Sequence, residues 1–61
     1  MTFGEKVKNV RLQLFLSQEK FAKQLGVSFA TVNRWEKGVC EPNYVGQKAF
    51  HEFCKKNDIH I

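Results

Sequence analysis

The chain has 61 residues, and its ten Lys and Arg side chains outnumber six Asp and Glu, for a formal net charge of +4. A chain of this length forms one small domain, which buries only about 60% of its unfolded surface. No apolar run approaches the roughly 18 residues of a membrane span. With two cysteines and no signal-like N-terminus, the reducing cytoplasm is the expected location. The mild positive charge permits a nucleic-acid partner but does not by itself establish one.

The first segment has the apolar spacing of an α-helix. Its apolar positions are separated by four, three and four residues, which places them on one helix face: Phe3, Val7, Val10 and Leu14. Thr2 followed by Glu5 fits a capping box, in which each side chain binds the other residue's backbone N–H. Gly4 in the first turn lowers the helix propensity slightly. We expect a helix over residues 2–14.

Serines and glycines delimit the next two helices. Ser17 and Ser28 are suited to helix starts, because a serine hydroxyl accepts a hydrogen bond from an unpaired backbone N–H of the first turn. Gly26 and Gly38 each follow a helical pattern and can adopt the left-handed conformation that ends a helix. The expected helices cover residues 18–25 and 29–37. Two short helices joined by a glycine-containing turn are the sequence form of a helix-turn-helix.

The third expected helix has two different faces when its residues are placed about 100° apart. Val32 and Trp35 lie together on an apolar face. The opposite face is polar and basic and contains no acidic residue: Ala30, Asn33, Arg34 and Lys37. Phe29 and Thr31 lie on the flanks, and Glu36 falls outside the basic face.

The last segment is helical again after a loop. Pro42 forbids a helix through that loop, and Asn43 can cap the next helix, over 44–56. Gly46 permits a close approach, and the expected buried stripe comprises Val45, Ala49, Phe50 and Phe53. Residues 58–61 are expected as a tail in which Ile59 could fold back onto the core. The sequence predicts an all-α domain of four helices over residues 1–57, with room for a short fifth turn.

The basic face of the third helix has the residue types that read DNA in the major groove, which accepts one α-helix. Arg34 can bind both acceptors of a guanine, and Asn33 can pair with an adenine or a phosphate. Ala30 and Phe29 can contact a thymine methyl group, although Phe29 could instead pack on the loop or the second helix. The candidates for phosphate contacts are Gln18, Lys23, Ser28, Thr31 and Lys37. The alternative is an ordinary solvated helix face.

At these positions the sequence resembles the lambda-repressor-like family, the Cro/C1-type or XRE helix-turn-helix domains. The resemblance rests on Arg11, on LSQEKFAKQLGVS, and on TVNRWEKG with Pro42 following. It implies that the second helix of the motif enters the major groove and that Gln18 touches a phosphate. It also implies a partly buried ion pair between Arg11 and Glu36. The base-contacting positions that it implies are Phe29, Ala30, Asn33 and Arg34.

The chain departs from the family pattern in two places. Phe15 stands where the family usually has a glycine, so the first helix could end differently or Phe15 could be exposed for a partner. Many relatives also use a fifth helix in dimerisation, which leaves the mode of dimerisation open here.

The leading hypothesis is sequence-specific binding of double-stranded DNA by a bacterial or phage transcription regulator, acting as a repressor and as a homodimer on a palindromic site. One alternative is a protein-interaction module, such as an antitoxin subunit, anchored by Phe15, Phe29 and Tyr44. The other is the DNA-targeting segment of a larger DNA-modifying enzyme.

The sequence gives no support for catalysis, a cofactor or a small-molecule ligand. It has no paired acids, nucleophile elbow or phosphate-binding glycine loop. Four residues include an HxxC pair that could begin a metal site if all four converged: Cys40, His51, Cys54 and His60. Thiols without a metal are the favoured interpretation, so no metal site is expected.

Overall fold

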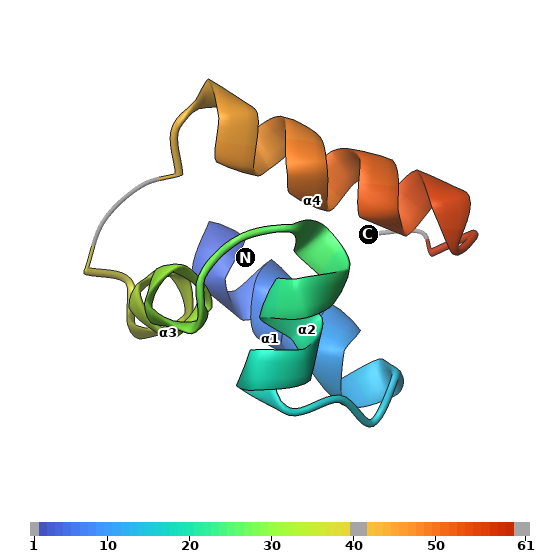
Figure 1. Cartoon of the computed structure of the whole chain (residues 1–61), viewed down its shortest axis with the longest axis horizontal. Coiled ribbons are helices and arrows are strands. Elements are labelled where there is room, and N and C mark those ends of the chain that lie inside the picture. The colour runs from blue at the N-terminus through green and yellow to red at the C-terminus, as the bar shows by residue number, and fades with distance from the viewer. Residues whose placement is uncertain (1, 40–41, 60–61) are drawn as a thin grey trace.

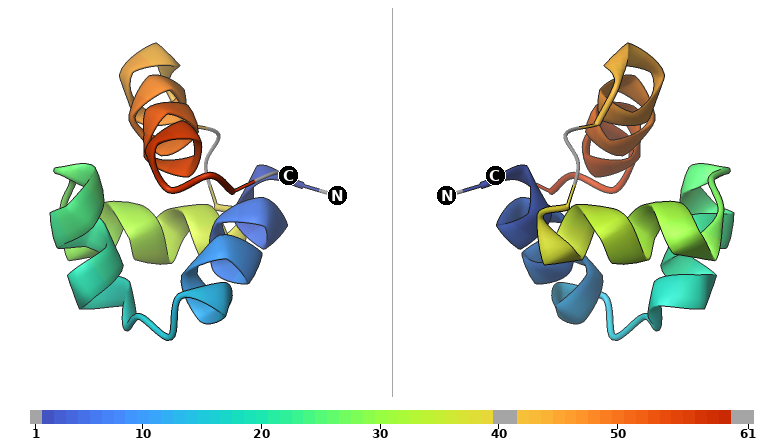
Figure 2. Two further views of the ribbon diagram at one scale, coloured as in Figure 1. Left: turned by 90° about the vertical axis from the view of Figure 1, so that its right-hand side faces the viewer. Right: turned by 90° about the vertical axis from the view of Figure 1, so that its left-hand side faces the viewer.

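The structure is a computed structural model that describes residues 2–39 and 42–59, and within these ranges it contains helices and no strand. The elements are α1 (Phe3–Gln13), α2 (Gln18–Leu25), α3 (Phe29–Lys37) and α4 (Tyr44–Lys56). α3 packs against both α1 and α2, and α4 packs against α2 (Figure 1). Figure 2 shows α4 standing on one side of the group formed by the other three helices. The prediction of an all-α helix-turn-helix fold is confirmed.

Each helix begins immediately after a residue whose side-chain oxygen accepts a hydrogen bond from the backbone N–H three residues later. These caps are Thr2, Ser17, Ser28 and Asn43. At α1 the arrangement is reciprocal, because the Thr2 N–H donates to the Glu5 carboxylate at 3.0 Å. This bond from the Thr2 backbone is the main cause of a lowered pKa of Glu5. Thr2 is the N-cap of α1 and Leu14 is its C-cap, so the helix is one residue shorter at each end than expected.

The first three helices all end near a residue with left-handed backbone. α2 and α3 are each followed by a glycine in this conformation, Gly26 with φ 77° and Gly38 with φ 73°. After α1 the same conformation falls on Phe15, which has φ 56° and is 95% exposed. A residue with a Cβ is strained there, at a cost of about 1–2 kcal/mol. The turn after α1 thus keeps the geometry that favours glycine although the residue is phenylalanine.

The core lies where the helices meet and is rich in aromatic rings. The buried apolar side chains are Val7, Val10, Phe21, Ala22, Val32, Trp35, Phe50, Phe53 and Cys54. The ring of Phe21 packs edge-on against Phe50 and Phe53, with centroids 6.4 and 5.2 Å away. Ile59 is half-buried and folds back against this core. None of the helices in the two described ranges has the length and apolar character needed to cross a membrane.

The expectation that Val45 belongs to the buried stripe of α4 is wrong, because Val45 is 69% exposed. The buried face of α4 instead passes through four positions separated by four, three and one residues: Gly46, Phe50, Phe53 and Cys54. Val45 lies about 100° away from Gly46 around the helix and therefore projects from the side of this face.

Candidate nucleic-acid interface

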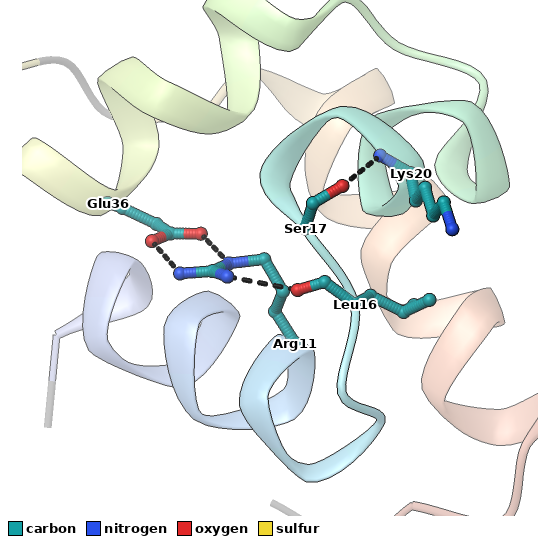
Figure 3. A network of polar contacts seen from close by, with 5 residues as sticks. All are labelled: Arg11, Leu16, Ser17, Lys20 and Glu36. Atoms are coloured by element: carbon teal, nitrogen blue, oxygen red, sulfur yellow. Dashed lines mark hydrogen bonds and ion pairs between the residues drawn. The ribbon is translucent and has the colours of Figure 1, made fainter.

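Arg11 joins α1 to the turn before α2 and to the C-terminal half of α3 (Figure 3). Its Nε donates to Glu36 Oε2 at 2.8 Å and its Nη2 donates to Oε1 at 3.0 Å, a bidentate pair. Its Nη1 donates to the Leu16 carbonyl at 3.0 Å. The two side chains are only 13% and 7% exposed. The hydrogen bond to Glu36 raises the pKa of Arg11.

This pair removes the one acidic side chain of α3 from its outer surface. Arg11 and Glu36 are the two residues that the family resemblance paired, and both lie on the inner side of α3. Beside the start of α2, the Ser17 hydroxyl accepts from the Lys20 N–H at 3.1 Å (Figure 3). The turn after α1 and the end of α3 are thus held by polar contacts, and the outer side of α3 is left to its basic and neutral residues.

The outer side of α3 is open to solvent along its length. Ala30, Arg34 and Lys37 are exposed, and Asn33 is half-buried. These are the four positions that periodicity placed on one face of the helix. Phe29, in the first turn, is 51% exposed. The outward side of α3 is therefore positively charged, and its first two residues, Phe29 and Ala30, are apolar.

The start of α3 carries two hydroxyl groups that contact each other. Ser28 Oγ accepts from the Thr31 N–H at 3.1 Å and lies 2.8 Å from Thr31 Oγ1. One hydroxyl hydrogen is used between the two oxygens, so the other can donate to a further acceptor. Ser28 is exposed and Thr31 is half-buried. The other expected phosphate contacts are on α2, where Gln18 is half-buried in the first turn and Lys23 is exposed.

A hollow of about 300 Å³ lies between α3 and the first turn of α4. The residues that line it are Val27, Thr31, Arg34, Trp35, Asn43, Val45 and Gly46. Arg34 and Thr31 thus share a surface with Val45 and Asn43, which sequence reasoning treated only as a core residue and a cap. No sequence signal could place them there, because the hollow depends on how α4 is oriented toward α3.

The metal hypothesis drew on Cys40 and His60, which lie outside the described residues. Cys54 is buried, and this burial raises the pKa of its thiol, whereas His51 three residues earlier is exposed. The two side chains of the HxxC pair therefore lie in different surroundings, one in the core and one in solvent. Throughout residues 2–39 and 42–59, no three His, Cys, Asp or Glu side chains come together as metal ligands would.

Comparison with known proteins identifies the family. The model of the helix-turn-helix family matches residues 7–44, from the middle of α1 to the start of α4. The chain belongs to the helix-turn-helix family, in its Cro/C1-type branch. The resemblance seen in the sequence is thereby confirmed, with α2 and α3 as the two helices of the motif.

The chain is also similar to a larger protein, the HTH-type transcriptional activator BcrR of Enterococcus faecalis. The two are 38% identical over 53 residues, which make up 87% of this chain and 26% of the relative. The chain therefore spans about a quarter of that relative's length. No solved structure matches the chain.

Proposed function

We propose that this helix-turn-helix domain binds double-stranded DNA in a sequence-specific manner, with α3 in the major groove, and that it serves a transcription regulator. One observation carries the proposal. The outer side of α3 presents Arg34 and Lys37, while the only acid of that helix, Glu36, is held inside by Arg11. A helix of this kind matches both the width and the negative potential of the major groove.

In this proposal the base contacts come from the first half and middle of α3. The exposed Arg34 donates to a guanine through its fork of N–H groups, and Asn33 pairs with an adenine edge. Ala30 and the half-exposed Phe29 pack on thymine methyl groups. These four side chains supply sequence preference, because they are the ones that reach base edges.

The phosphate contacts surround that face and fix its orientation on the duplex. They are proposed for Gln18, Lys23, Ser28, Thr31 and Lys37. The Ser28–Thr31 pair supports this role, because one of its two hydroxyl hydrogens is available for a phosphate oxygen. The first turn of α4 has no acidic residue, so it adds no repulsion where the hollow meets Arg34.

We further propose that the protein acts as a homodimer and represses by occupying its site. A single module of this type buries only about 600–1,000 Å² on DNA. A dimer that binds two half-sites about 34 Å apart buries more surface and therefore binds more tightly. The similar protein from E. faecalis is named an activator. A reporter gene whose promoter overlaps a DNA site bound by the protein distinguishes repression from activation. Repression lowers the expression of the reporter, and activation raises it.

Selection of bound sites from random double-stranded DNA with the purified protein tests this function. We expect enrichment of a short motif, and a palindrome with half-sites one helical turn apart if the protein is a dimer. A single short motif would overturn the dimer while keeping the DNA function. No enrichment would overturn sequence-specific binding altogether. The Glu52→Gln variant, changed at an exposed position of α4, should enrich the same motif and serves as the matched control.

A further inference from the structure

Two glycines from different helices allow the rest of the domain to approach Trp35 of α3 unusually closely. A Cβ added to Gly4 of α1 would lie 2.1 Å from the Trp35 carbonyl oxygen and 3.4 Å from the Glu36 Cα. A Cβ added to Gly46 of α4 would lie 2.7 Å from Cζ2 of the Trp35 ring. Cβ atoms in proteins essentially never come within 3.0 Å of atoms to which they are not bonded, so neither position accepts a side chain without movement.

These contacts occur where α3 is attached to its neighbours. Trp35 is buried, and its ring packs edge-on against Phe3 with centroids 5.2 Å apart. The next residue, Glu36, is held by Arg11. Gly4 and Arg11 are seven residues apart on α1, or about 10 Å along its axis. The second half of α3 is therefore held at two points along α1, and α4 closes on the same tryptophan from another side.

We propose that Gly4 and Gly46 are positioning residues for DNA recognition, a proposal that rests on the DNA-binding function above. They set how closely α3 lies to α1 and α4, and so they set how far Arg34 and Asn33 project into the major groove. Neither glycine contacts DNA. Their effect acts through Trp35, whose backbone and ring they contact.

The size of the expected movement supports a role in recognition. With an alanine at position 4, its Cβ and the Trp35 carbonyl oxygen have to separate by about 0.9 Å to reach a 3.0 Å contact. The Cβ is fixed to the backbone of α1 and the oxygen belongs to the backbone of α3, so the two helices have to shift relative to each other. Binding residues need their positions held within about 0.5 Å. An alanine at position 46 requires only about 0.3 Å, but its neighbour is a rigid, buried ring.

The test compares affinity for the selected site with affinity for random duplex DNA of the same length, at a temperature where circular dichroism shows each variant folded. Gly4→Ala should weaken binding to the selected site by roughly fivefold or more, the loss expected when one base contact is misplaced. Binding to random DNA should change little, because phosphate contacts tolerate small shifts. The control is Gly38→Ala, which strains a backbone with φ 73° but meets no atom within 4 Å. It should lower stability and leave the ratio of the two affinities unchanged.

A second pair of variants covers the case in which Gly4→Ala does not fold. Gly46→Ala should lower the same affinity ratio by a smaller factor. Adding Trp35→Phe removes Cζ2 and should restore part of the ratio, although it lowers stability. Unchanged ratios in Gly4→Ala and Gly46→Ala, or no restoration in the double variant, would overturn the positioning role.

The orientation of α3 toward α1, measured in the DNA-free protein from backbone residual dipolar couplings, separates this inference from the function on which it rests. Gly4→Ala should change that orientation and Gly38→Ala should not. If the parent protein enriches no DNA motif, the proposed function fails even if α3 moves. If the parent enriches a motif and Gly4→Ala neither moves α3 nor loses affinity, the positioning role alone fails.

Discussion

The inner and outer sides of α3 differ in burial and in charge. On the inner side, Val32 and Trp35 are buried and Glu36 is paired with Arg11. On the outer side, Arg34 is exposed, and Ala30 and Lys37 are exposed with it. The inner contacts fix where the helix lies, whereas the outer side chains contribute little packing to the fold. In the proposed function, stability and recognition therefore depend on different residues of one nine-residue helix, and substitution of an outer side chain should change recognition while leaving stability nearly unchanged.

The charges of α3 are divided in the same way. Glu36 follows Arg34 by two residues, yet the carboxylate faces α1 while Arg34 is in solvent. If Glu36 were on the outside, its charge would offset one of the two cations there and repel phosphate. The Arg11 pair therefore both holds α3 and leaves its outer side without an acidic residue.

Glu36→Ala should cause the largest loss of stability. It leaves the Arg11 guanidinium buried without its partner, and breaking such a pair costs about 3–5 kcal/mol. Urea unfolding followed by circular dichroism measures the free energy of unfolding. Glu52→Ala removes the same charge from an exposed position of α4 and should cost less than about 0.5 kcal/mol. Equal losses in the two variants would mean that the inner pair does not hold α3.

Arg34→Ala should have the opposite profile. We expect it to weaken binding to the selected site by about 1–3 kcal/mol and to relax the preference at one base pair. The free energy of unfolding should stay within about 0.5 kcal/mol of the parent, because the side chain is exposed. Fluorescence anisotropy with the selected site and single-base variants of it provides the measurement. Unchanged affinity together with lost stability would reverse the assignment of the two sides.

Local signals in the sequence predicted most of the fold. The caps Thr2, Ser17, Ser28 and Asn43 and the glycine stops placed α1, α2, α3 and α4 to within one residue, because these signals act within a single turn of backbone. Periodicity likewise separated the two sides of α3. The family resemblance supplied the Arg11–Glu36 pair, which no local pattern would reveal because 25 residues separate its members.

Apart from the Arg11–Glu36 pair, the contacts between helices could not be predicted from the sequence. Val45 looked buried because the pattern of α4 does not state which way the helix is turned toward the others. Gly4 looked only like a weak helix former, whereas its value lies in the close contact with the backbone of α3. The hollow beside Arg34 depends on the same tertiary arrangement. The base and phosphate contacts themselves stay predictions until DNA is bound.

Phe15→Gly tests whether exposure alone marks a DNA-binding residue. Phe15 is 95% exposed, more than the 51% of Phe29, which we assign to a base contact, yet it lies in the turn after α1. Glycine relieves the strain at φ 56° and should raise the free energy of unfolding by about 1 kcal/mol, while affinity for DNA stays the same. Phe15→Ala is the control, because it removes the ring but keeps the Cβ and the strain. Similar stability gains in both variants would show that the ring, and not the backbone, causes the cost.

Lys37→Ala should have the smallest effect, and it distinguishes the phosphate contacts of the outer side of α3 from its base contacts. Lys37 is at the end of the helix, and we assign it to a phosphate contact. Its loss should therefore lower the affinity for the selected site and the affinity for random DNA by the same factor. The slope of log affinity against log salt concentration is negative, and it should become shallower by about one, since one fewer counterion is released. Lys55→Ala makes the same charge change in the last turn of α4 and should leave the slope unchanged. A larger loss for the selected site than for random DNA would move Lys37 from the phosphate contacts to the base contacts, and equal slopes for both variants would place it outside the interface.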